Sequence, residues 1–188
     1  ELIFESCRVP GTNLLGDIFL GKVKKIMPGL NAAFVDVGYE KDAFLHYLDL
    51  GPQILSLNKF TNLAHNGSAT THLLGDFKNE HDIVKTGKVN KVLHSNQNIL
   101  VQVMKEPIST KGPRVTSDIS LPGRFLVLIP FTDKISISAK VRRLEERDRL
   151  RRLVQSIKPK NFGVIIRTVA ENKTVAELDA DMKDLIDK

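Results

Sequence analysis

GDIFLGKVKKIMPGLNAAFVDVGYEKDAFLHYL, residues 16–48, consists of three short strand-like runs separated by turn signals. The first run, 16–27, ends at a Pro-Gly pair that favours a turn. The second run, 31–38, and the third, 43–48, are separated by the charged turn YEKD. Runs of this length that are rich in Val, Ile and Phe are typical of β-strands. The stretch therefore predicts three consecutive strands of a β-rich domain.

Side chains in the second and third runs alternate between two faces, as period-2 strand geometry requires. Phe34 and Asp36 alternate with small apolar residues, and so do Phe44 and His46. Exposed rings with polar neighbours suit stacking on nucleic-acid bases, at roughly 1–3 kcal/mol per base. Phenylalanine is also a default core residue, so the pattern alone leaves both interpretations open.

Basic residues precede these rings. Lys22, Lys24 and Lys25 on the first run would supply a positive groove for phosphates. The formal net charge of +6 and the pI of about 9.4 favour a polyanionic partner, either nucleic acid or an anionic membrane surface. The membrane alternative is the weaker one, because no basic amphipathic helix with a large apolar face is evident. No apolar run approaches the ~20 residues that cross a bilayer.

The rest of the first domain is less regular. Residues 51–85 mix Asn, Gly, Ser, Thr and His without a clear period and predict a long loop with a turn of helix on either side. A hairpin with its turn at 94–96 is expected after this loop. Within 98–106, apolar residues alternate as in a half-buried strand.

The pattern changes after Pro122. RFLVLIPF, residues 124–131, predicts a strand buried on both faces, and ISIS, 135–138, is expected to pair with it. FGVIIRTV, 162–169, predicts another buried strand. Because these strands alternate with helical patterns, we expect a small α/β unit.

Two helices belong to this unit. In 141–157, apolar residues recur at helical spacing, and Pro159 stops the helix. Thr174 and Glu177 form a capping box that opens the second helix. The arginines of 142–152 could bind RNA, but the interleaved acids favour a solvated, ion-paired face.

The sole cysteine, Cys7, excludes an internal disulfide, fits a reducing cytoplasm and is too little for a zinc site. The chain begins at Glu1 without a signal-peptide pattern and ends at Lys188 within an amphipathic helix. We therefore expect a piece of a longer protein. We assign no metal to the residues that could suggest one, because their spacing does not make them converge: His65, His72, His81, Asp36, Glu40 and Asp42.

The stretch 16–50 resembles the opening of an S1 domain, a five-stranded OB fold, and 82–106 resembles the part of that domain that contains its fourth strand. OB folds bind single strands on the exposed face of strands 2 and 3. The resemblance implies that the aromatic residues lie on that face with a lysine beside them: Phe34, Phe44, His46 and Lys22.

KGPRVTSDISLPGRFLVL, 111–128, and GVIIRT, 163–168, resemble the ribonuclease E/G family, and the resemblance extends over roughly 13–187. In that family the α/β unit is a 5′ sensor, which grips the 5′-monophosphate of RNA. The residues that match its phosphate ligands are Arg167 and Thr168, through their side chains, and the strand with Gly123 and Val127, through main chain. Lys111 matches an RNA-contacting lysine beside the aromatic face.

The chemistry of an Arg-Thr pair agrees with this role. A planar guanidinium donates two parallel hydrogen bonds to a phosphate, and an adjacent hydroxyl adds a third. An isolated Arg-Thr would be read as an ordinary surface pair, so the assignment to Arg167 and Thr168 depends on the resemblance.

The resemblance implies a mixed α+β organisation: a remnant of a preceding subdomain at 1–12, an S1-type OB barrel at 13–120 and a sensor-like α/β subdomain at 121–188. It also implies an endoribonuclease parent, a homo-oligomer that hydrolyses single-stranded RNA with Mg²⁺ held by aspartates outside this chain. We therefore predict a fragment that binds 5′-monophosphorylated RNA without cutting it. The alternative is a non-catalytic or ribosome-associated S1 protein whose α/β unit contacts other proteins.

Overall fold

A computed structural model describes residues 16–69, 71 and 73–187 of the chain. The remnant of a preceding subdomain expected at 1–12, with Cys7, lies outside the described residues. Among the described residues, no helix is long and apolar enough to cross a membrane.

Two compact units make up the chain, and they are not simple halves of the sequence. Described residues 16–69 and 80–119 form the first unit. The second unit contains 120–187 together with the described residues of 71–79, a segment that the sequence carries inside the first unit. After the segment within 71–79, the chain therefore returns to the first unit for residues 80–119 and then forms the rest of the second unit.

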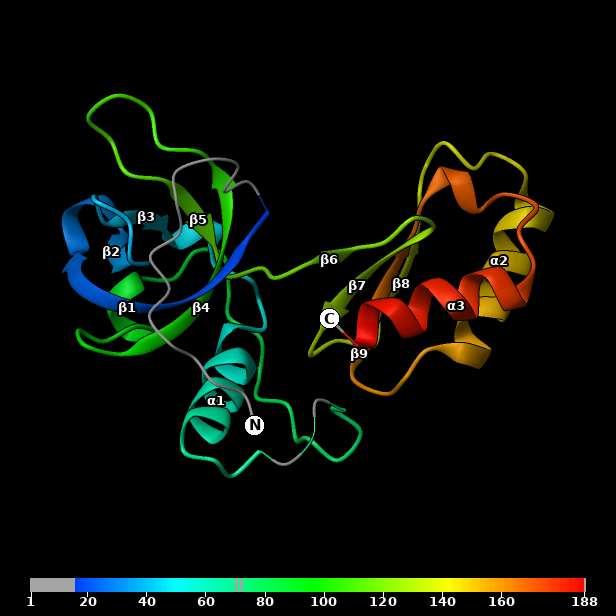
Figure 1. The fold of residues 1–188 in the computed structure, drawn as a ribbon, viewed down its shortest axis with the longest axis horizontal. Coiled ribbons are helices and arrows are strands. Elements are labelled where there is room, and N and C mark those ends of the chain that lie inside the picture. The colour runs from blue at the N-terminus through cyan, green and yellow to red at the C-terminus, as the bar shows by residue number, and fades with distance from the viewer. Residues whose placement is uncertain (1–15, 70, 72, 188) are drawn as a thin grey trace. The chain divides into compact units, whose positions relative to one another are not determined.

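The first unit is a closed five-stranded barrel (Figure 1). Its strands are β1 (Ile18–Met27), β2 (Ala32–Asp36), β3 (Ala43–His46), β4 (Asn98–Lys105) and β5 (Arg114–Thr116). Around the barrel they follow the order β1-β2-β3-β5-β4; β3 and β5 run parallel, and the other neighbours are antiparallel. This is the arrangement of an OB fold, so the predicted barrel is confirmed.

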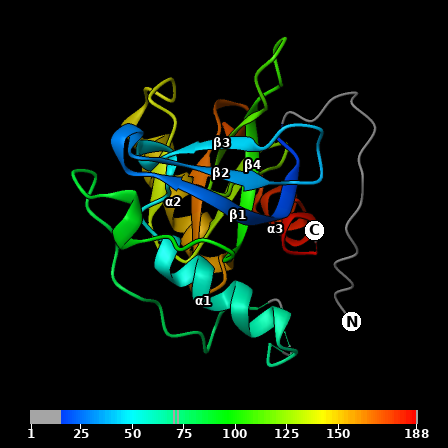
Figure 2. The same cartoon turned by 90° about the vertical axis from the view of Figure 1, so that its left-hand side faces the viewer.

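Apolar side chains that alternate with outward-facing ones fill the barrel. β1 and β2, which lie side by side in Figure 2, approach closely at Gly21, where an added Cβ would lie 2.5 Å from Cγ1 of Val35. Burying one Val or Leu contributes roughly 1.5–3 kcal/mol, which ties the strands to this register. The fully buried residues of the barrel strands are Val23, Ala32, Ala33, Val35, Ala43, Leu45, Ile99, Val101 and Val115.

The long loop predicted for 51–85 is wrong in its first part, which forms helix α1 (Ile54–His65). α1 packs against β4 and buries polar as well as apolar side chains. The Thr61 hydroxyl donates to the Leu57 carbonyl at 2.8 Å, and Ser56 Oγ accepts from the Glu80 amide at 2.8 Å. Because Thr61 and Ser56 have hydrogen-bond partners, they can occupy the buried side of the helix, where they interrupt the apolar period that would have indicated a helix.

The predicted hairpin around 94–96 is also wrong. β4 pairs with β1 and β5, and the residues before the turn form a short 3-10 helix, η3 (Val89–Lys91), instead of a strand. Asn31 holds this segment: its Nδ2 donates to the Gly87 carbonyl at 3.1 Å, and its Oδ1 accepts from the Val89 amide at 2.8 Å. A distant side chain thus supplies the partners that a second strand would have offered.

The second unit contains a four-stranded sheet with the order β6-β7-β9-β8. Its strands are β6 (Leu121–Pro122), β7 (Leu126–Pro130), β8 (Ile135–Ile137) and β9 (Phe162–Ile166). The prediction that ISIS pairs with the preceding strand is wrong, because β8 pairs with β9 in parallel. Parallel neighbours need a crossover, and helix α2 (Leu144–Ile157) provides it between them.

β7 is buried on one face only, which corrects the prediction of burial on both. Leu126 and Leu128 are fully buried, whereas Val127 and Ile129 are half-exposed. Helix α3 (Val175–Ile186) packs against β7, and α2 packs against β8. The opposite face of the sheet, with Val127, therefore stays more open.

Both helices follow the sequence pattern. α2 buries Leu150 and Val154 and ends before Pro159. The capping box at the start of α3 is confirmed: Thr174 Oγ1 accepts from the Glu177 amide, and the Glu177 carboxylate accepts from the Thr174 amide. The side of α3 expected to be apolar is buried, through Leu178, Met182 and Leu185.

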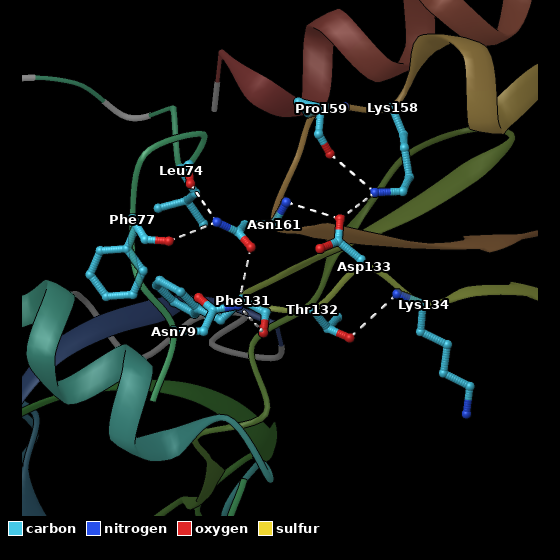
Figure 3. A network of polar contacts seen from close by, with 10 residues as sticks. All are labelled: Leu74, Phe77, Asn79, Phe131, Thr132, Asp133, Lys134, Lys158, Pro159 and Asn161. Carbon is cyan, nitrogen blue, oxygen red and sulfur yellow. Dashed lines mark hydrogen bonds and ion pairs between the residues drawn. The ribbon is translucent and has the colours of Figure 1, made fainter. Parts of the chain in front are cut away.

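Asn161 fastens the 71–79 segment to the rest of the second unit (Figure 3). Its Nδ2 donates to the carbonyls of Leu74 at 2.7 Å and Phe77 at 2.9 Å, and its Oδ1 accepts from Asn79 at 3.2 Å. The rings of Phe77 and Phe131 lie 5.3 Å apart. Asn79 also donates to the Phe131 carbonyl at 3.2 Å. None of these contacts has a local sequence signature.

Candidate functional site

Phe34, Phe44 and His46, named here the aromatic row, lie together on the outer face of β2 and β3. Phe34 is directly opposite Phe44, with ring centroids 5.8 Å apart at 65°, and the Phe44 and His46 centroids are 6.4 Å apart. All three side chains are partly exposed, whereas their neighbours within the two strands, Ala33, Val35, Ala43 and Leu45, are fully buried. The strand alternation expected from the sequence is confirmed, and the interpretation of both phenylalanines as core residues is wrong.

His46 has a fixed orientation within this row. Its Nδ1 accepts a hydrogen bond from the Leu48 amide at 3.1 Å, where the chain enters the 3-10 helix η2 (Tyr47–Asp49). A neutral His46 then carries its proton on Nε2. The ring is thus held as a donor at the end of the aromatic row.

Lysines of β1 border the row on one side. A β-bulge between Val23 and Lys25 aligns Lys25 with Phe34, and Lys22 aligns with Asp36. Lys24 is ion-paired with Asp36 at 3.0 Å. A hydrogen bond from the Gly38 amide, and then the Lys24 contact, lower the pKa of Asp36. Lys22 and Lys25 are exposed, so these two are best placed to meet a polyanion.

Arg114 borders the row on the other side, and it was missed in the sequence. It aligns with Phe44 across the parallel β3–β5 pair and binds Asp49 through two hydrogen bonds of 2.8 and 3.0 Å. These bonds raise the pKa of Arg114 and hold its guanidinium in one orientation. The inward position of Val115, its neighbour in the strand, could have indicated that Arg114 faces outward.

Lys111 lies in an exposed turn just before β5. Its amide donates to the Ile108 carbonyl at 3.0 Å. An added Cβ at the next residue, Gly112, would lie 2.2 Å from the Asp42 carbonyl oxygen, so glycine is required for this close approach. The Phe44 amide donates to the Pro113 carbonyl at 2.8 Å. The backbone that carries Lys111 is therefore tied to the strand that carries Phe44.

In the second unit, Arg167 directly follows β9, and its side chain reaches the turn between β6 and β7. Its Nη1 donates to the carbonyls of Gly123 at 2.7 Å and Arg124 at 3.3 Å. The Gly123 amide donates to the Leu126 carbonyl at 2.8 Å. Val127 aligns with Ile165, two residues before Arg167, so Val127 and Arg167 share the more open face of the sheet.

Thr168 follows Arg167, and its hydroxyl lies 3.1 Å from that of Ser138. Ser138 follows β8, which is parallel to β9, so both hydroxyls lie at the same edge of the sheet. Ser138 was missed because only the parallel pairing brings the two strand ends together. Gly123, Ser138, Arg167 and Thr168 are called the Arg167 cluster below.

Two of the four arginines of α2 pair with acids, which supports the ion-paired interpretation of 142–152 for these two. Arg149 binds both carboxylate oxygens of Glu146 at 2.7 Å and lowers the pKa of Glu146 to about 2. Arg151 pairs with Asp148 at 3.7 Å. Arg147 donates to two main-chain carbonyls, at Ser138 and Val141. These arginines of α2 therefore take part in hydrogen bonds and ion pairs within the second unit.

A metal-binding cluster is not part of this arrangement. Within the described part of the chain, no group of three or more His, Cys, Asp or Glu side chains could hold a metal ion. The chemistry that the described site residues offer is ring stacking at the aromatic row and hydrogen bonding to an anion at the Arg167 cluster.

Comparison with known proteins identifies relatives of both units. Residues 120–188 match the model of the ribonuclease E/G family. Over 176 residues, 93% of this chain and 22% of the relative, the chain is 37% identical to Ribonuclease E of Synechocystis sp.. Ribonuclease G of Haemophilus influenzae is 36% identical over 92% of this chain and 31% of its own length. For Ribonuclease G of Escherichia coli the values are 34%, 89% and 30%.

The chain thus spans between about a fifth and a third of the length of these relatives. The family model covers residues of the second unit, and the alignments with the relatives extend over about nine-tenths of this chain. From these matches and this geometry, the chain belongs to the ribonuclease E/G family.

Proposed function

We propose that this chain is the RNA-binding part of a single-strand-specific endoribonuclease that acts in RNA processing and decay. In this proposal the aromatic row clamps single-stranded RNA, and the Arg167 cluster holds the 5′-monophosphate. The observation that carries the proposal is the aromatic row itself, three partly exposed rings with Lys22 and Lys25 on one side and Arg114 on the other.

On the barrel face, the rings would bind the bases by stacking and the lysines would bind the phosphates by charge. Every base presents a π face, so Phe34, Phe44 and His46 bind without demanding a sequence, at roughly 1–3 kcal/mol per stacked base. Lys22, Lys111 and their neighbours would follow the phosphates, which makes the affinity dependent on salt. This combination suits a protein that must accept many different RNAs.

The Arg167 cluster would supply selectivity for the 5′ end. The Arg167 guanidinium and the Thr168 hydroxyl are suited to a terminal phosphate, and Val127 lies on the same face of the sheet. A 5′-hydroxyl lacks the charge that Arg167 recognises. A triphosphate is bulkier than the site would accept, so the proposal favours RNA that has already been processed.

Hydrolysis itself is assigned to the parent enzyme outside this chain. The family's activity uses Mg²⁺ held by aspartates, and the described residues offer no matching cluster. We therefore propose that the chain binds RNA without cutting it, within a larger homo-oligomeric enzyme.

The test is binding of one short, single-stranded, A/U-rich RNA with a 5′-monophosphate, 5′-triphosphate or 5′-hydroxyl, at fixed salt. Arg167→Ala should remove the preference for the monophosphate, and Phe34→Ala should weaken all three RNAs alike. Val84→Ala, at a side chain that is 68% exposed, is the apolar control for the barrel. Equal affinity of the unaltered chain for all three 5′ ends would reject the sensor role. The better description would then be a non-catalytic or ribosome-associated S1 protein whose second unit contacts other proteins.

A further inference from the structure

Asp181, on the side of α3 that faces the sheet, binds the turn that carries Gly123. One carboxylate oxygen accepts from the Arg124 amide at 2.9 Å, and the other accepts from the amides of Phe125 at 2.8 Å and Leu126 at 2.9 Å. Three consecutive backbone amides that converge on one point make a strong anion site. In this protein the anion is supplied by the chain itself.

Glycine is needed where the carboxylate meets the turn. An added Cβ at Gly123 would lie 2.8 Å from each carboxylate oxygen of Asp181. The fit is therefore specific: the turn and the carboxylate can meet in this way only while residue 123 has no side chain.

The same peptide groups bind Asp181 at one end and Arg167 at the other. The Gly123 carbonyl and the Arg124 amide belong to one peptide unit, and the Arg124 carbonyl and the Phe125 amide belong to the next. Because a trans peptide is planar, its N–H and C=O point in opposite directions. Arg167 binds the two carbonyls, and Asp181 binds the two amides.

Two peptide dipoles are therefore held between a carboxylate and a guanidinium. The carboxylate orients them and, by polarising the chain of hydrogen bonds, strengthens the carbonyls as acceptors for Arg167. We infer that Asp181 is a positioning residue for Arg167 and sets the guanidinium for the 5′-monophosphate. This inference rests on the proposed function of the Arg167 cluster.

The geometry distinguishes this positioning role from that of a carboxylate that competes with the 5′-phosphate for Arg167. A carboxylate that mimicked the phosphate would have to lie where the phosphate meets Arg167. Asp181 instead contacts the amide ends of the turn, while Arg167 contacts the carbonyl ends. Removing the carboxylate should thus weaken monophosphate binding rather than strengthen it.

The experiment compares the full 188-residue chain with Asp181→Asn, using the same RNA oligonucleotide with a 5′-monophosphate or a 5′-hydroxyl. Asp184→Asn, an exposed position on the same helix, is the matched control. The measured quantity is the ratio of the two affinities. Asp181→Asn should lower this ratio by about fivefold, as expected for one weakened hydrogen bond to a charged group, and Asp184→Asn should leave it unchanged.

A double variant tests whether the effect passes through Arg167. In the Arg167→Ala background, where the preference is already lost, Asp181→Asn should not lower the affinity for the 5′-monophosphate RNA any further, whereas an independent structural effect would lower it. Circular dichroism checks that the second unit folds. If Asp181→Asn does not fold, Gly123→Ala breaks the same contact from the other side and should lower the ratio as well.

Each outcome has a distinct meaning. If the unaltered chain prefers the monophosphate and Asp181→Asn keeps or increases that preference, the positioning role is wrong and the proposed function stands. Additive losses in the double variant would also overturn it. If the unaltered chain shows no preference at all, both the sensor role and the positioning role fail together.

Discussion

The aromatic row and the Arg167 cluster are built in different ways. The three rings come from neighbouring strands within residues 34–46: Phe34 and Phe44 are cross-strand partners, and His46 lies beside Phe44 on the same strand. The Arg167 cluster gathers groups from 123, 138 and 167–168, and the turn at 123 is held by residue 181. A surface that accepts any base needs only rings on one face of a sheet. A site for one chemical group needs donors fixed by contacts between distant parts of the chain.

The largest expected effect concerns the long-range contacts of the second unit. Asn161 has a positive φ of 64° and donates to two carbonyls, at Leu74 and Phe77. Asn161→Asp keeps a residue that tolerates this backbone conformation but sets a carboxylate against those carbonyls, which should destabilise the second unit by about 3 kcal/mol or more. Thermal unfolding followed by circular dichroism measures the effect.

Asn96 provides the matched comparison within the barrel. It has a similar positive φ of 65° but is exposed, so Asn96→Asp should change stability by only a few tenths of a kcal/mol, about the usual range for a surface substitution. If the two variants lost equal stability, the long-range hydrogen bonds of Asn161 would not explain its loss.

The next effect concerns the barrel face. Phe44 lies between Phe34 and His46, so Phe44→Ala removes the central ring of the aromatic row. Affinity for single-stranded RNA should fall by about tenfold, within the ~1–3 kcal/mol typical of one stacked base. Fluorescence anisotropy should show the same factor for 5′-monophosphate and 5′-hydroxyl RNA. A loss of affinity for only one of the two RNAs would contradict the proposal that the aromatic row and the Arg167 cluster act as separate sites.

A smaller effect is expected from the ion pair of α2 at low pH. The Arg149 guanidinium lowers the folded-state pKa of Glu146 to about 2, from an ordinary value of 4.5. The stability it contributes is complete above about pH 4.5 and is lost as the pH falls toward 2. Because Arg149 is 36% exposed and partly screened, we expect about 1–2 kcal/mol.

Glu146→Gln should flatten this part of the stability curve of the second unit, as measured by denaturant unfolding between about pH 2 and 6. Glu145, whose side chain is 90% exposed, is the control, and Glu145→Gln should leave the curve unchanged. An unaltered slope in Glu146→Gln would show that other carboxylates account for the acid sensitivity.

The smallest effect concerns the charges beside the aromatic row. Lys22→Gln should weaken RNA binding only about twofold to threefold, and should lower the slope of log affinity against log salt by about 0.7, the value for one phosphate contact on a single strand. Lys91→Gln, at an exposed lysine of η3, should leave the slope unchanged. Equal slopes for both variants would remove Lys22 from the RNA-binding face.

Much of the fold could be predicted from the sequence, but not evenly. The strands that became β1, β2, β3 and β9, both helices of the second unit and the capping box at Thr174 were found. α1 was missed because Ser56 and Thr61 take buried positions within it. The pairing of β8 with β9 was missed because apolar composition does not identify a partner strand.

Candidate site residues follow the same division. Alternation suggested an outward face for Phe34, Phe44 and His46, and the resemblance to an S1 domain favoured it, whereas Arg167 and Gly123 were grouped only through resemblance to a family. Ser138 and Asp181 had no signal in the sequence, since each meets the cluster through tertiary contacts.

The sequence by itself determined which residues of the barrel strands face outward, because successive Cβ atoms in a strand point to opposite sides whatever the strand packs against. Tertiary structure alone decided that segment 71–79 belongs to the second unit, and that Arg167 and Asp181 grip opposite ends of the same two peptide groups. These contacts join residues far apart in the chain, and their partners are chosen by topology and hydrogen-bond satisfaction, which no local pattern encodes.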